Sequence, residues 1–130
     1  MRLKLALAVA VTVAFSWPAW AHHSHGNYVD AFTDLEGTVQ EVHLLLPHSW
    51  VYLKVNKGGE EQIWALEATA RNGLERIGGT KETVKPGDKI KARCHVLRDG
   101  SNGCLLGFLK DTSGSVKDWD GGNAPAPKDF

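Results

Sequence analysis

The sequence predicts a mostly β fold, a five-stranded OB-like barrel with one short helix between its third and fourth strands. Three observations predict it: five segments show strand-type alternation, turn-forming residues separate them, and the one helical pattern follows the third segment. This element order is that of the OB-fold, and closing a sheet into a barrel removes edges that a small domain could not otherwise protect. An open β-sandwich with a similar number of strands is the alternative, but it would not need a helix at that place.

The first three strands are expected in the middle of the chain. Residues 35–45 alternate with a period of two and are rich in Thr and Val. Pro47 interrupts the apolar run that follows, and the alternation resumes over residues 49–55. The turn cluster 56–59 leads into a third strand at 62–67, so the second and third strands should form a hairpin.

The remaining elements are expected in the second half of the chain. Residues 69–77 predict a helix of about two turns, because their apolar residues are three or four apart and two glycines follow as a stop signal. Two further strands are expected at 89–97 and 104–110. Residues 113–130 contain Gly-Gly, two prolines and few apolar residues, so we expect a flexible tail there.

Residues 1–21 have the features of a secretory signal peptide. A short positively charged start precedes the uncharged apolar run 5–15, and Ala19 and Ala21 are the small residues that a signal peptidase reads. This run is about half as long as a membrane span needs, and no second run follows. We therefore expect a periplasmic or secreted protein with no membrane span.

Cleavage after Ala21 would remove 21 of the 130 residues and leave 109. The mature chain would comprise a His-rich segment 22–34, the barrel domain 35–112 and the tail 113–130. It would keep 13 of the 15 basic residues and all 15 acidic residues, a formal charge of −2. A mildly acidic domain without a basic block has no electrostatic reason to bind nucleic acid or an anionic membrane.

The two cysteines, Cys94 and Cys104, are expected to form a disulfide. They lie symmetrically about Asp99, in the turn between the last two strands, and should face each other across that hairpin. An oxidising compartment favours this pairing over the alternative, a thiolate metal site.

Three of the six histidines, His22, His23 and His25, lie within the first four positions of the expected mature chain. Cleavage would make His22 the terminal residue, whose free amine and ring nitrogen can chelate one metal ion. A further imidazole completes a three-nitrogen set, a histidine brace, which suits Cu(II) because copper stands highest in the affinity order of divalent ions. The other terminal copper motif needs a histidine in third place, where this chain has Ser24.

His48 is the best internal partner for this terminus, because it lies between the first two strands and Pro47 stiffens the chain before it. His43 and His95 are expected to be structural. The metal-ligand candidates are His22, His23, His25 and His48. They predict a periplasmic metal-binding protein, for copper, that binds or delivers the ion and has a periplasmic protein as a partner; a solvated His-rich stub without a metal is the alternative reading.

Trp50, Tyr52 and Trp64 are expected in the barrel core. In the alternative function, a non-metal binding module, these aromatic residues instead lie on a barrel face that receives a small ligand or a partner protein. No nucleophile, carboxylate pair or phosphate-binding loop stands out, so an enzyme is not the favoured class. An oxidative copper enzyme of the brace type would share the histidine site.

The chain resembles a bacterial family of small exported proteins of unknown function, DUF6152. The resemblance covers roughly residues 22–110 and rests on five segments: His22-His23-Ser24, Leu35-Glu36-Gly37-Thr38-Val39, Pro47-His48-Ser49-Trp50, Lys85-Pro86-Gly87-Asp88 and Asp99-Gly100-Ser101. It implies the same fold and an exported location. The family carries no established activity, so the function has to be argued from the residues.

Overall fold

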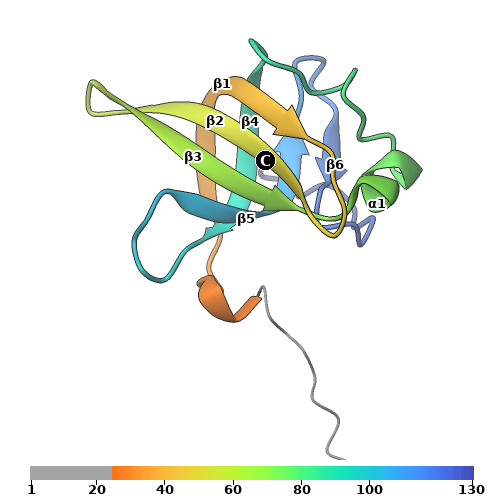
Figure 1. The fold of residues 1–130 in the computed structure, drawn as a ribbon, viewed down its shortest axis with the longest axis horizontal. Coiled ribbons are helices and arrows are strands. Elements are labelled where there is room, and N and C mark those ends of the chain that lie inside the picture. The colour runs from red at the N-terminus through yellow and green to blue at the C-terminus, as the bar shows by residue number, and fades with distance from the viewer. Residues whose placement is uncertain (1–24) are drawn as a thin grey trace, which may run out of the picture.

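The computed structural model describes residues 25–130, which form a closed, mostly β barrel (Figure 1). Six strands follow one another in the order β3-β2-β1-β4-β5-β6, and a parallel pairing of β3 with β5 closes the barrel. The prediction of a five-stranded OB-like barrel with a helix between strands three and four is confirmed, with β6 as an additional strand. The closure excludes the open β-sandwich. The expected signal peptide, His22 and His23 lie outside the described residues.

The bounds of the elements are close to those predicted. They are η1 (His25–Asn27), β1 (Thr33–His43), β2 (Ser49–Lys57), β3 (Glu60–Ala68), α1 (Arg71–Arg76), β4 (Lys89–Val96), β5 (Gly103–Lys110) and β6 (Val116–Asp118). Among residues 25–130, no helix has the length and apolar character needed to cross a membrane.

The long strand β1 bends so that it belongs to both halves of the barrel. Its residues Thr33–Thr38 pair with β4, and Thr38–His43 pair with β2. Gly37 lies at the bend, where an added Cβ would overlap the carbonyl oxygen of Lys54 on β2. The close crossing of the two strands therefore requires a residue without a side chain.

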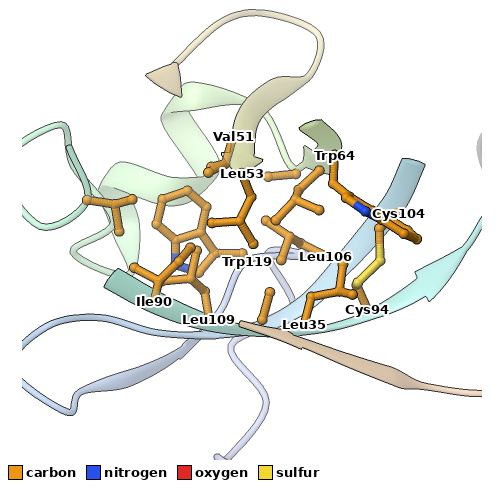
Figure 2. Packing of buried hydrophobic residues seen from close by; sticks show 14 of the residues in the cluster. Leu35, Val51, Leu53, Trp64, Ile90, Cys94, Cys104, Leu106, Leu109 and Trp119 are labelled. Carbon is orange, nitrogen blue, oxygen red and sulfur yellow. A yellow bond between two sulfur atoms is a disulfide. The ribbon is translucent and has the colours of Figure 1, made fainter. Parts of the chain in front are cut away.

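The core fills the inside of the barrel with side chains from every strand from β1 to β5. Figure 2 shows the indole ring of Trp119 among Val51, Leu53, Ile90 and Leu109. The predicted disulfide joins Cys94 and Cys104, whose side chains are fully buried and whose Cα atoms are 5.6 Å apart. It lies in the core across the β4–β5 hairpin and fixes the spacing of these two strands.

The segment after Ser113 differs from the flexible tail expected from its composition. Residues of β6 pair with the end of β5, and Trp119 is only 1% exposed. The amide of Trp119 donates to the carbonyl of Gly107 at 2.7 Å, and the Trp119 carbonyl accepts from the amide of Thr69 at 2.9 Å. One large apolar residue thus ties a segment rich in Gly and Pro to the barrel, because its ring fills the core.

Candidate functional site

A row of five cross-strand neighbours runs over the outer face of the barrel. Its members are His95 on β4, Leu105 on β5, Glu67 on β3, Trp50 on β2 and His43 on β1. Directly paired residues point to the same face of a sheet. Most of the residues beside them along the strands are buried and the others are partly buried against the core, so this row faces away from it.

The segment before β1, residues 25–32, crosses this face and is called the arm below. The amide of Val29 donates to the carbonyl of Val96 at 2.9 Å, and the carbonyl of Asn27 accepts from the amide of Arg98 at 2.9 Å. Tyr28 forms a β-bridge with Leu97 and is only 6% exposed. Backbone pairing next to the β4–β5 loop therefore fixes the arm on the barrel.

Glu67 connects the arm to the loop between β1 and β2. It is 7% exposed, and its Oε2 accepts a hydrogen bond of 2.5 Å from the Tyr28 hydroxyl. Its Oε1 lies 3.1 Å from Nδ1 of His48. Burial raises the pKa of Tyr28, and the hydrogen bond and negative charge of Glu67 raise it further, so the hydroxyl remains a donor. A buried carboxylate is tolerated because both of its oxygens have partners.

The loop that carries His48 is held by hydrogen bonds at its base. The hydroxyl oxygen of Ser49, which is fully buried, accepts from the amide of Leu45 at 3.2 Å. The carbonyl of Leu45 accepts from the amide of Arg71 at 2.9 Å, which ties the loop to the start of α1. The His48 side chain is 44% exposed. With Nδ1 directed at Glu67, its other ring nitrogen, Nε2, is left for a ligand from solvent.

A small cavity of about 110 Å³ lies between the arm and strands β4 and β5, and two more histidines line it. His25 and His95 both line this cavity, together with Tyr28 and Leu105. His95 is fixed in place, because its ring stacks on Phe32 with 4.2 Å between the ring centroids.

A carboxylate belongs to the same surroundings. The pKa of Asp120 is raised above its ordinary value, first by desolvation of its carboxyl group. Among the smaller influences on this pKa, His25 and His95 lower it, and the carboxylates of Asp118 and Glu67 raise it. His25 and His95 at the cavity, and His48 with Glu67, therefore lie on the face that the arm crosses, and these four residues are called the cluster below.

The structure brings two of the four predicted metal ligands, His25 and His48, to this face. The other two, His22 and His23, are outside the described residues. Within residues 25–130, no group of three or more His, Cys, Asp or Glu side chains is arranged to hold a metal ion.

One histidine lies outside the cluster, and two residues that belong to the site were not predicted from the sequence. The exposed His43 is 2.8 Å from the carboxylate of Glu41 and does not take part in the cluster. Glu67 and Tyr28 were not among the predicted site residues. A signal for Glu67 exists in the sequence: it is the one charged residue between Trp64 and Ala68, in the apolar end of a strand.

The aromatic residues do not share a face. Trp64 is in the core as expected, at 6% exposure, but Trp50 and Tyr52 are half-buried on the outside of β2. The prediction that these two fill the core is wrong, because Val51 and Leu53 occupy the inward positions of this strand. A binding face formed by all three rings is therefore not present.

Fold and site define a small β-barrel domain with a buried carboxylate and several histidines under and around an N-terminal arm. The chain belongs to the family described as "Family of unknown function (DUF6152)", whose model matches residues 9–106. The match confirms the resemblance and includes the arm, Glu67, His48 and both cysteines. Neither the curated proteins nor the solved structures provided a significant match.

Proposed function

We propose that the protein is an exported metal-binding protein that holds Cu(II) on the outer face of its barrel, for binding or delivery. The ligands are His22, through its amine and ring, and His48, with His23 and His25 beside them. The observation that carries the proposal is the 3.1 Å contact of His48 Nδ1 with the buried carboxylate of Glu67. Histidine ligands of metals usually donate their second ring N–H to such a carboxylate, which orients the ring and makes the free nitrogen a better ligand.

The position of the arm supports the participation of the mature N-terminus. His25, which belongs to the cluster, lies on the arm. Three residues of chain span about 10 Å at most, so cleavage after Ala21 would leave the new terminus no farther than this from His25. An amine and two or three imidazoles form a nitrogen-rich ligand set, which favours Cu(II) over Mg²⁺ or Ca²⁺.

The proposal is tested by Cu(II) titration of the mature protein, using a competing chelator to bring the affinity into range. The comparison protein carries one extra glycine before His22, which converts the chelating amine into an amide. We expect this addition and His48→Gln each to weaken Cu(II) binding by about tenfold or more. His43→Gln is the matched control, because His43 is an exposed histidine outside the cluster, and it should leave the affinity unchanged.

Equal affinity with and without the added glycine would exclude the brace. If His48→Gln binds Cu(II) as tightly as the wild type, His48 is not a ligand, and its contact with Glu67 no longer supports the proposal. Electron paramagnetic resonance of the copper-loaded protein gives an independent measurement, since nitrogen hyperfine structure should be weaker in His48→Gln than in His43→Gln.

A further inference from the structure

A second hollow of the molecule is formed by other residues, near the start of β4 and the end of β5. It is an open groove of about 740 Å³, a volume typical of ligand sites. Four lysines from three strands line it: Lys54, Lys89, Lys91 and Lys110. Three carboxylates, those of Glu36, Glu61 and Asp111, also line it, so the lining has little net charge and the ammonium groups without a carboxylate partner are the ones available to a ligand.

Two of the three carboxylates are engaged within the protein. Glu61 pairs with Lys54 at 3.4 Å. Asp111 uses its Oδ1 to accept from amides of the turn between β5 and β6, at 2.9 and 3.1 Å. Lys91 pairs with Asp34 at 3.4 Å and lies directly opposite Glu36 on the neighbouring strand. By contrast, neither Lys89 nor Lys110 forms an ion pair within 4 Å among residues 25–130. The groove is therefore close to neutral overall, and the ammonium groups of Lys89 and Lys110 are the two in its lining that are open to a carboxylate from outside.

The last two residues of the chain, Asp129 and Phe130, lie at the edge of the groove and contact cations there; this edge is called the rim below. Asp129 accepts a hydrogen bond of 2.8 Å from Nη1 of Arg93. The ring of Phe130 lies beside three cations: Lys91 Nζ at 4.9 Å, Arg93 Cζ at 5.0 Å and Lys110 Nζ at 5.1 Å from its centroid. An acidic residue followed by an aromatic one thus occupies a surface made of cations, where both charge and cation–π attraction act.

We propose that the groove and this rim form a docking site for an acidic segment of a partner protein that contains an aromatic residue. The aromatic ring of the partner takes the place of Phe130, and its carboxylates lie against Lys110 and Lys89. Because Lys91 and Lys110 belong to both the groove and the seat of Phe130, Asp129 and Phe130 compete with the partner for the same cations. The proposal does not depend on metal binding, since the groove contains none of the histidines.

The test is a fluorescence anisotropy titration with a labelled peptide, a run of glutamates followed by phenylalanine, on the full mature protein. A variant with Asp129→Asn and Phe130→Ala removes the side chains that occupy these cations, which opens the seat of Phe130. We expect this variant to bind the peptide about tenfold more tightly than the wild type. In that opened protein, Lys89→Gln with Lys110→Gln should weaken binding by about tenfold. Lys81→Gln with Lys85→Gln is the matched control, because it removes the same charge at exposed lysines outside the groove and should change little.

Binding should also weaken as salt is raised from 0.05 to 0.5 M, as expected for contacts between exposed charges. Circular dichroism of every variant checks that the barrel is folded. Failure of the opened variant to bind the peptide, or equal loss with the control lysines, would overturn the proposal. A wild-type dimer in sedimentation analysis that Phe130→Ala abolishes would overturn it too, because the occupant would then be a second copy of this chain.

Discussion

Replacing Tyr28 with Phe removes the hydroxyl that links the arm to the barrel and keeps the buried ring. The lost hydrogen bond, 2.5 Å long, ends on a carboxylate that is 7% exposed, so water cannot freely replace the donor. A hydrogen bond to a charged group contributes about 1.5 to 3 kcal/mol, and more is at stake when the partner stays buried. We therefore expect Tyr28→Phe to lower the free energy of unfolding by about 2 kcal/mol.

Urea denaturation followed by tryptophan fluorescence measures this change. In a thermal scan, the Tm of a domain of this size should fall by about 4 °C or more for each kcal/mol. Tyr52→Phe is the matched control: Tyr52 is half-buried on the outer face, and its hydroxyl makes no hydrogen bond within residues 25–130. It should change stability by less than about 0.5 kcal/mol. If both variants unfold at the wild-type urea concentration, the Tyr28 hydroxyl does not stabilise the arm, and the reasoning from Glu67 is refuted.

Two further predictions concern the core and an ion pair. Trp119→Ala should destabilise the barrel by about 3 to 5 kcal/mol, because it empties the centre of the core, whereas Trp50→Ala on the outer face should cost less than half as much; similar urea midpoints for the two variants would contradict the assigned core. The second prediction uses Asp34, whose pKa is lowered first by its hydrogen bonds from Arg93. Its stabilising effect is complete above the unfolded-state pKa of about 3.9 and is lost as the pH falls through the lower folded-state value. Asp34→Asn should therefore lose less stability than the wild type when the Tm is followed from pH 5 down to pH 2, and parallel curves would show that the pair contributes nothing.

The barrel and its disulfide could be predicted because both follow from local patterns. A period of two residues marks each strand, and the symmetry of Cys94 and Cys104 about Asp99 is enough to pair them across one hairpin. The inward face of β2 could also have been recognised. Its aliphatic residues Val51 and Leu53 share one set of alternate positions, which leaves the other set to the aromatic rings.

The site could be predicted only in part, because it depends on contacts between segments far apart in the sequence. The loop position of His48 was visible, but its partner Glu67 is recognised only when Tyr28 of the arm is placed over β3. In the same way, nothing next to Trp119 in the sequence indicates that its ring fills the core, since it stands between two aspartates. Composition describes a segment on average, and one bulky side chain can decide where that segment lies.

The position of the disulfide has a practical consequence for anyone who purifies this protein. Cys94 precedes His95 and Cys104 precedes Leu105, so the cross-link lies directly beneath two members of the outer row. In protein made in a reducing cytosol, the same side chains would lie on strands β4 and β5 without the disulfide that joins these strands. Ligand affinities from such protein and from oxidised material would describe two different surfaces, so the thiol content of each preparation should be known before they are compared.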